Sequence, residues 1–160
     1  MNKPLALPLQ TRWMLRKDMD QVCDIEKRSS PEGYWTEDVF AEHLRQRNCI
    51  GMVAEFEQTI FGYMLYEFHK GTLKVIALAV DPHHRRRGVG EKMVCRLIDK
   101  LASQRRSKIQ FVVREQRLNA QLFLRSLGFR AIRFYRDYYD SDELSRGAIL
   151  FQYSLPLKAA

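Results

Sequence analysis

The sequence has few cysteines, and they lie far apart. Its 160 residues include only Cys23, Cys49 and Cys95, each in a segment with periodic apolar residues. Their spacing matches neither a disulfide framework nor a zinc site, so we expect buried free thiols in a reducing compartment. No set of histidines, cysteines and aspartates is spaced like metal ligands, and no metal cofactor is therefore expected.

Long hydrophobic runs are also missing. No apolar stretch reaches the length of a transmembrane helix, and residues 1–10 lack the basic-then-apolar pattern of a signal peptide. With 46% hydrophobic and 29% charged residues, the composition is that of a globular protein. We therefore expect a cytoplasmic protein without membrane contact, made of an N-terminal arm (1–10) and one domain (11–157) without repeats or linkers.

Acidic residues are in deficit, since 27 Lys and Arg oppose 19 Asp and Glu for a net charge of +8. Such an excess attracts polyanions such as nucleic acid, the ribosome surface or a phosphorylated cofactor. The sequence shows no helix-turn-helix, zinc-ligand spacing or aromatic RNA-binding signature, so we expect no dedicated nucleic-acid binding. A nucleic-acid-associated basic domain stays an alternative, and it predicts binding that weakens steeply with salt.

Hydrophobic periodicity predicts strands interspersed with helices. An Asp18–Gln21 capping box is expected to open the first helix, Thr36 to cap the second, and Gly128 to end the last. The predicted strands are 11–16, 49–56, 59–68, 73–80, 109–114, 129–135 and 148–155, and the two later helices are 88–105 and 118–127. This order predicts a mixed α/β (α+β) fold, with helices on the faces of a mostly antiparallel sheet.

The most informative segment joins a β-branched strand to an amphipathic helix. It contains Arg85 with two further arginines, and then Gly88 and Gly90 at the mouth of the helix. A helix N-terminus offers free amides and a partial positive charge, and glycines let an anion approach the backbone, so this segment predicts a phosphate-binding loop. A dinucleotide-binding loop would need a third glycine where Met93 stands, and a Walker loop would need lysine where Glu91 stands.

This loop resembles the acetyl-CoA pyrophosphate loop of the GNAT (GCN5-related) N-acetyltransferases. The matching residues are Asp81, Pro82, Arg85, Gly88 and Gly90. A second segment, Ala120 with Phe123–Phe129, resembles the end of the family's fourth helix and lies at the right separation. The resemblance covers about residues 11–157. It implies the GNAT fold of about seven strands and four helices, with acetyl-CoA as the donor substrate for direct attack by a primary amine in a ternary complex.

The resemblance also implies roles for individual residues. Backbone groups of Leu78, Ala79 and Val80 would contact the pantetheine arm of the cofactor between two splayed strands, although the same residues also suit the core. The groups that would hold the pyrophosphate are the Arg85 side chain and the amides of Arg87, Gly88, Val89, Gly90 and Glu91. The family's CoA-contacting asparagine falls at Arg117 in this sequence, and Asn119 lies close by.

Two further segments resemble the RimI-type ribosomal-protein N-terminal alanine acetyltransferases. They are Pro31 with Tyr34 and Trp35, and the pair Tyr138 and Tyr139. In those enzymes the two loops hold the first residues of the substrate, which implies a protein or peptide N-terminus as acceptor, with a ribosomal protein among the candidates. The alternatives are that the tyrosine pair only packs on the surface, and that the first segment is a turn closing on the core.

The catalytic pair of the RimI type is absent. Its glutamate base falls at Val112 and its tyrosine acid at Leu124. Tyr138 or Tyr139 could accept a proton through water, and other candidate bases are Glu32, Glu67 and His69. Loss of a base hurts an α-amine acceptor less than a lysine, since deprotonation at pH 7 costs on the order of 1 kcal/mol for the first and about 4–5 kcal/mol for the second. A catalytically weak, acetyl-CoA-sensing partner-binding protein and a small-molecule amine acetyltransferase stay open as alternatives.

Overall fold

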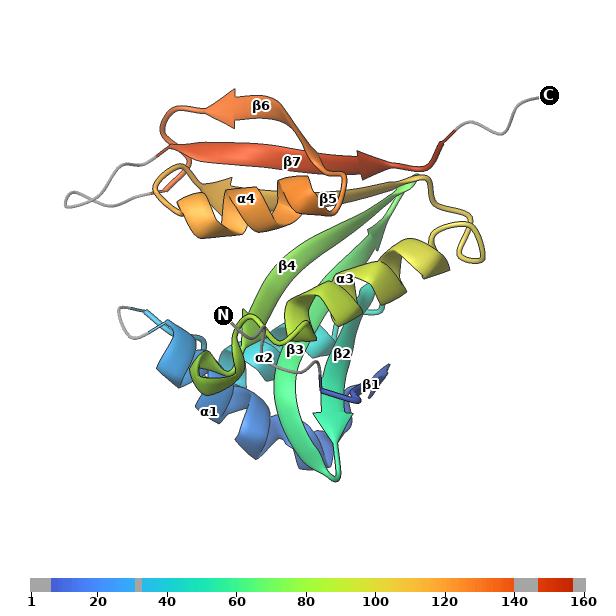
Figure 1. Ribbon diagram of the computed structural model, residues 1–160. Helices are drawn as coiled ribbons and strands as arrows, with labels where there is room; N and C mark the ends of the chain where they lie inside the picture. Colours follow the sequence, from blue (N-terminus) through green and yellow to red (C-terminus); the bar gives the residue numbers. More distant parts are fainter. Residues whose placement is uncertain (1–6, 31–32, 140–146, 157–160) are drawn as a thin grey trace, which may run out of the picture. The chain divides into compact units, whose positions relative to one another are not determined.

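The computed structural model describes residues 7–30, 33–139 and 147–156. The chain divides into two compact parts (Figure 1). The N-terminal part consists of Met1–Phe68 and Ile76–Leu97, and the C-terminal part of His69–Val75 and Ile98–Ala160.

Seven strands form one sheet in the order β1-β2-β3-β4-β5-β7-β6. The strands are β1 (Gln10–Trp13), β2 (Cys49–Phe56), β3 (Thr59–His69), β4 (Thr72–Val80), β5 (Lys108–Arg114), β6 (Arg130–Tyr135) and β7 (Ala148–Ser154). The α-helices are α1 (Met19–Ser29), α2 (Glu37–Leu44), α3 (Val89–Lys100) and α4 (Leu118–Ser126), and short 3-10 turns are η1 (Arg16–Asp18) and η2 (Pro82–His84). β4 and β5 run parallel, whereas β1–β2, β2–β3, β5–β7 and β6–β7 are antiparallel. The predicted mixed α/β class with a mostly antiparallel sheet is confirmed.

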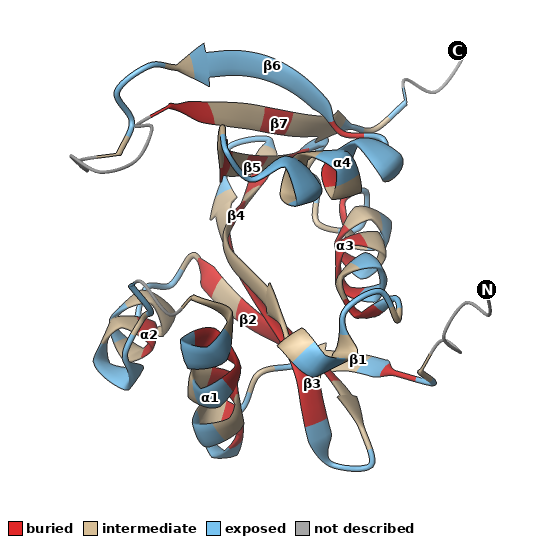
Figure 2. Ribbon diagram, turned by 60° about the vertical axis from the view of Figure 1, so that its left-hand side comes forward, coloured by how far each residue is buried: buried red, intermediate tan, exposed pale blue. Residues whose placement is uncertain are grey.

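In the N-terminal part, α1 and α2 lie on one side of β2 and β3, and α3 lies on the other (Figure 2). Alternate residues of β3 serve the two layers. Tyr63 is fully buried in the core that α1 and α2 cover. Its neighbour Gly62 faces α3, where a Cβ atom would lie 2.8 Å from side-chain atoms of both Val89 and Met93. The missing side chain therefore lets the first turn of α3 pack directly against the sheet.

The capping box predicted at the start of the first helix is wrong. Asp18 precedes α1 but makes no side-chain capping bond to it. Its carboxylate instead accepts bonds from the Leu15 amide at 2.7 Å and from the Arg12 side chain at 2.7 and 2.8 Å. The Gln21 side chain bonds the β3 hairpin, accepting from the Ile60 amide and donating to the Gln58 carbonyl. Both side chains tie α1 to strands instead of capping the helix.

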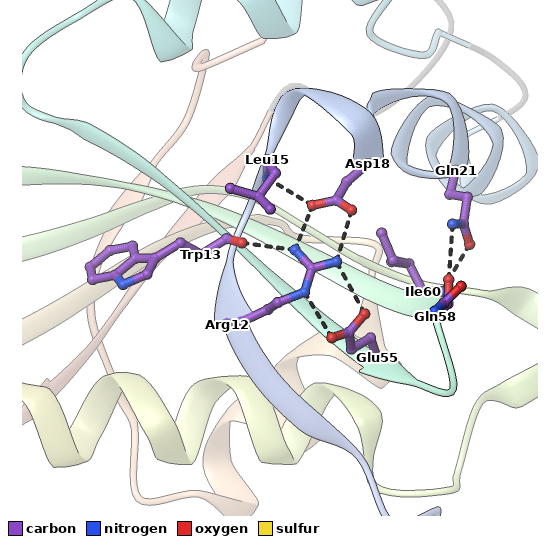
Figure 3. Close-up of polar contacts among 8 residues, drawn as sticks. All are labelled: Arg12, Trp13, Leu15, Asp18, Gln21, Glu55, Gln58 and Ile60. Atoms are coloured by element: carbon purple, nitrogen blue, oxygen red, sulfur yellow. Dashed lines mark hydrogen bonds and ion pairs between the residues drawn. The ribbon is translucent and has the colours of Figure 1, made fainter.

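Arg12 is the centre of this network, and Figure 3 shows its guanidinium between two carboxylates. Besides the paired bonds to Asp18, its Nε lies 2.8 Å from a carboxylate oxygen of Glu55 on β2. Both carboxyl groups consequently have a lowered pKa, chiefly because they accept hydrogen bonds from Arg12. The edge strand β1, the turn η1 and β2 are thereby joined at one cation.

Other predicted boundaries differ by a few residues. The first strand ends at Trp13 instead of residue 16, and α3 ends at Lys100 instead of continuing to residue 105. The predicted β2–β3 hairpin is confirmed, with Glu57 and Gln58 both at positive φ (49° and 68°). All three cysteines are free, but only Cys49 is buried, whereas Cys23 and Cys95 are half-buried. Burial raises the pKa of the Cys49 thiol to about 11, which makes it unreactive at neutral pH.

In the C-terminal part, α4 packs on one face of the three strands β5, β7 and β6 (Figure 1). The residues of β5 that face α4, Ile109, Phe111 and Val113, are buried. Phe129 completes this layer through ring contacts with Phe111 at 5.4 Å and with Tyr153 at 5.6 Å. The opposite face carries the alternate β5 residues, which are half-buried or exposed.

Replacing Asp18 by asparagine should lower the free energy of unfolding at pH 7 by about 2–3 kcal/mol, because charge-assisted bonds to a buried carboxylate are lost. A lowered folded-state pKa stabilises the fold above the unfolded pKa, and that stability disappears as the pH falls through the folded value. The difference between the parent and D18N should therefore shrink between about pH 5 and pH 2. Chemical denaturation across this range measures it, with the exposed Asp20→Asn as control. A difference that does not change with pH would contradict the assignment.

Candidate functional site

The predicted phosphate-binding loop lies in the N-terminal part, between β4 and α3, and is anchored by Asp81. This residue is 8% exposed. Its Oδ1 accepts the His83 amide at 3.1 Å and the Arg28 guanidinium at 3.1 Å, and its Oδ2 lies 3.3 Å from Nδ1 of His84. Burial alone would raise the pKa of Asp81, but the His83 amide and the charges of Arg28 and His84 outweigh it and lower that pKa. A carboxylate therefore holds the start of the loop.

Further contacts hold the loop against the rest of this part. The Asp81 amide donates to the Phe61 carbonyl on β3 at 2.8 Å. The ring of Phe61 meets the His84 ring edge-on at 4.6 Å. Sequence reasoning placed Asp81 in the loop motif but did not identify Arg28 or Phe61 as its supports, because both come from distant segments.

Gly88 brings the chain into α3. Its φ is +81°, and no atom lies within 4 Å of the position that a Cβ would occupy. The first α-helical bond of this turn runs from the Lys92 amide to the Gly88 carbonyl at 2.9 Å. The amides of Val89, Gly90 and Glu91 precede that bond and belong to the turn whose amides lack helical acceptors. Helix-start amides that follow such an open position suit an anion.

The cations of this loop fit a diphosphate ligand. Arg85 and Arg86 are exposed, and Arg87 is half-buried. The Nε of Arg87 is buried without a hydrogen-bond partner among the described residues. A buried donor without an acceptor is costly, and an anion in the loop would satisfy it. The loop residues present thus fit the pyrophosphate of CoA.

Leu78, Ala79 and Val80 lie in the part of β4 beyond the stretch, Thr72–Val75, that pairs with β5. All three are half-buried. Ala79 packs against the core, which agrees with a structural role for its side chain. The Val80 carbonyl accepts a hydrogen bond from the Ser29 hydroxyl at 3.3 Å, so one of its backbone groups already has a partner.

The segment between α1 and α2 was predicted to hold the acceptor. Its residues differ in burial, since one packs on the core and another is exposed. Trp35 packs on the core, with its ring edge-on to Phe40 at 5.4 Å and stacked on His43 at 4.5 Å. Tyr34 is 42% exposed, and the Lys27 ammonium lies 5.6 Å from its ring centre. Pro31 lies outside the described residues. Trp35 is thus a core-closing residue, whereas Tyr34 is free to contact a ligand.

The predicted tyrosine pair lies in the C-terminal part, where β6 ends. Tyr138 packs between Tyr135 and Tyr139, at ring distances of 5.5 and 4.9 Å. The Arg114 guanidinium lies 3.7 Å from the centre of the Tyr139 ring. Burial, with a smaller effect of Tyr138, raises the pKa of Tyr139 although Arg114 and Arg117 lower it. Tyr139 is therefore a hydrogen-bond donor at neutral pH and a poor base.

Residues 19–129 match the family model described as "Acetyltransferase (GNAT) family". This chain belongs to the GNAT acetyltransferase family. Membership establishes it as an acetyl-CoA-dependent N-acetyltransferase by family, as the loop motif predicted.

Individual relatives agree. An N-alpha-acetyltransferase of Sulfurisphaera tokodaii is 26% identical over 139 residues, covering 79% of this chain and 83% of the relative. The [Ribosomal protein bS18]-alanine N-acetyltransferase of Escherichia coli (strain K12) is 25% identical over 150 residues, covering 87% and 99%. The crystal structure of the ribosomal-protein alanine N-acetyltransferase of E. coli superimposes with a TM-score of 0.83 at 20% identity, covering 94% of this chain and 96% of the other. The predicted likeness to the RimI type and the predicted GNAT fold are confirmed.

The structure places both residues at which the RimI resemblance expects the catalytic pair. Val112 is half-buried and pairs with Leu150 across the β5–β7 ladder, so an aliphatic side chain stands where the RimI resemblance expects a base. Leu124 is 2% exposed and belongs to the core beneath α4. Asn119 and Arg117 are exposed at the first turn of that helix. Neither Val112 nor Leu124 can transfer a proton.

The structure describes two of the other candidate bases. Glu67 is half-buried on β3, opposite Cys49 in the β2–β3 ladder, and His69 is exposed at the end of that strand. Glu32 lies outside the described residues. In the described ranges, no group of three or more His, Cys, Asp and Glu residues is arranged to hold a metal, and no helix is long and apolar enough to span a membrane.

Replacing Gly88 by valine should weaken CoA binding at least about tenfold. A β-branched residue at positive φ costs about 1–3 kcal/mol of strain and fills the open space at residue 88, directly before the first α3 amides. Gly71, at φ +70° with similarly open surroundings, offers a matched control at the β3–β4 turn. Isothermal titration with CoA should show the loss for G88V and near-parental affinity for G71V. Equal affinity of G88V and the parent would remove the loop from the CoA site.

Proposed function

We propose that this enzyme acetylates the N-terminal α-amine of a protein or peptide. The observation that supports this acceptor most is the absence of a base at Val112 together with the burial of Leu124. An α-amine needs on the order of 1 kcal/mol to lose its proton at pH 7, whereas a lysine needs about 4–5 kcal/mol. A site that supplies no dedicated base suits the first acceptor. The printed activities of the Sulfurisphaera and E. coli relatives are consistent with it.

The loop residues hold the donor substrate. Arg85, Arg87 and the amides of Gly88 to Glu91 bind the pyrophosphate, and backbone groups of Leu78 to Val80 bind the pantetheine arm. Acetyl-CoA supplies a thioester whose thiolate leaving group has a pKa near 8.5. Because an α-amine loses its proton readily, the reaction depends little on a general base. Positioning of the amine next to the thioester then provides most of the rate acceleration.

The acceptor is held by Tyr34 and by the pair Tyr138 and Tyr139, with Pro31 and Trp35 shaping the same segment as Tyr34. The raised pKa of Tyr139 keeps its hydroxyl protonated, so it can donate a hydrogen bond to a peptide carbonyl or to the developing oxyanion. Its ring orientation is set by Arg114, which stacks on it. In this account Tyr139 acts as a donor, and the amine loses its proton to solvent.

We further propose the setting of the reaction. The acetyltransferase domain spans residues 11–157 after an arm of residues 1–10, and the enzyme acts in the cytoplasm. A ribosomal protein is one candidate acceptor, by analogy with the E. coli relative.

A matched set of amines tests the acceptor. With acetyl-CoA, peptides that have a free α-amine should be acetylated at that amine, as read by mass spectrometry. The same peptides with a blocked N-terminus and an internal lysine should react at least about a hundredfold more slowly, as the difference in deprotonation cost requires. Polyamines and aminoglycosides should also react poorly.

Two outcomes would contradict the proposal. Turnover confined to polyamines or aminoglycosides would make the enzyme a small-molecule acetyltransferase. Tight CoA binding without turnover on any amine would favour an acetyl-CoA sensor that binds a partner protein. The rate of acetyl-CoA hydrolysis measured without any amine is subtracted from each turnover rate as background.

A further inference from the structure

The net charge of the chain lies entirely in one of its two parts. The N-terminal part has 13 Lys and Arg against 13 Asp and Glu, and is neutral. The C-terminal part has 14 Lys and Arg against 6 Asp and Glu, and carries the whole +8. The donor loop with its three arginines belongs to the neutral part. The net excess of the C-terminal part therefore calls for a partner other than the CoA phosphates.

Four of the 14 cations of the C-terminal part lie on the sheet face that α4 leaves open. Residues directly opposite each other in an antiparallel ladder share a face. Gln110 on β5 is opposite Gln152 on β7, and their side chains bond at 2.9 Å. Arg130 on β6 is opposite the same Gln152. The residues of this face, named here the cationic face, are Lys108, Gln110, Val112 and Arg114 on β5, Ala148, Leu150, Gln152 and Ser154 on β7, and Arg130, Arg133 and Tyr135 on β6.

The cationic face has four cations and no acidic residue in its three strands. Lys108, Arg130 and Arg133 are exposed. Arg114 is half-buried, and its Nη1 is buried without a hydrogen-bond partner among the described residues. Cations of one sign gathered on a surface attract an anionic partner.

The same face adjoins the tyrosine pair that the proposed function assigns to the acceptor. Val112 lies in its middle row, and Tyr138 and Tyr139 adjoin it through Tyr135 and Arg114. From Arg114 to Lys108 the strand β5 extends about 20 Å, the length of about six residues of extended peptide. A polypeptide that starts at the tyrosine pair can therefore follow the face past its cations.

We propose that the cationic face binds an acidic stretch of the acceptor polypeptide, within about the first eight residues after its N-terminus. The inference rests on the proposed function, because it names the chemistry of that acceptor. Lys108, Arg130 and Arg133 pair with Asp or Glu side chains of the acceptor. Gln110 and Gln152 offer neutral hydrogen-bonding groups between them.

Peptides of equal length test the inference. They share the first two residues and differ in the next six positions, which are rich in Glu, Gln or Lys. The KM of the acidic peptide should be about tenfold below that of the neutral peptide, because about three exposed ion pairs contribute that much. The basic peptide should have the highest KM of the three. Added salt should reduce the difference, and kcat should change little.

The triple variant Lys108→Gln, Arg130→Gln, Arg133→Gln should raise the KM of the acidic peptide to that of the neutral one, leaving the neutral peptide and CoA binding unchanged. The matched control is Arg125→Gln, which removes an exposed cation from α4 on the other side of the strands. Circular dichroism and thermal unfolding verify that the triple variant is folded. The control should behave as the parent.

The outcomes separate the inference from the proposed function. Equal KM values for acidic and neutral peptides would overturn the inference alone, since N-terminal acetylation would still be observed. Failure to acetylate any peptide N-terminus would overturn both. Inhibition by short single-stranded RNA that the triple variant abolishes, without discrimination among peptides, would assign the face to nucleic acid and also overturn the inference.

Discussion

The buried carboxylate of Asp81 is the contact on which the donor side of this enzyme depends. A charge with so little exposure needs partners, and it takes them from the His83 amide, from Arg28 on α1 and from His84. These contacts fix the backbone conformation of the segment between β4 and α3. Gly88, at positive φ and with open space at its Cβ position, can then lead into α3, and the close packing at Gly62 holds the helix itself. Ligand binding by backbone amides requires such a rigid support, since a mobile loop would lose ordering entropy on binding.

The residues proposed for acetyl transfer, and the net charge, are distributed unevenly between the two parts. The N-terminal part, with zero net charge, contains the proposed donor loop and Tyr34, whereas the C-terminal part contains the tyrosine pair and all the excess charge. With Val112 and Leu124 unable to transfer protons, the proposed function assigns selectivity among amines to their own pKa values and to their positioning. In that proposal, the stacking of Arg114 on Tyr139 orients the ring that contacts the acceptor.

Local patterns predicted much of the fold. The β2 boundaries and the Glu57–Gln58 hairpin agreed with the structure, because alternation and turn chemistry are encoded within a few residues. The Asp18 capping box failed because Arg12, from another element, offers a stronger partner than the helix amides. The loop motif predicted the donor residues, but the supports Arg28 and Phe61 could not be found from it, since only folding brings them to Asp81. The division of charge could not be seen either, because each part combines distant segments of the chain.

The central claim is that the pyrophosphate of CoA binds at the loop before α3. The backbone NMR resonances of the first residues of α3 test it most directly. CoA is added to isotope-labelled protein, and the amide signals are followed by heteronuclear NMR. The account predicts that the amides of Gly88, Val89, Gly90 and Glu91 shift most, and that the Arg87 side-chain Nε–H moves with them. Binding of CoA that leaves these signals in place while others shift would contradict it.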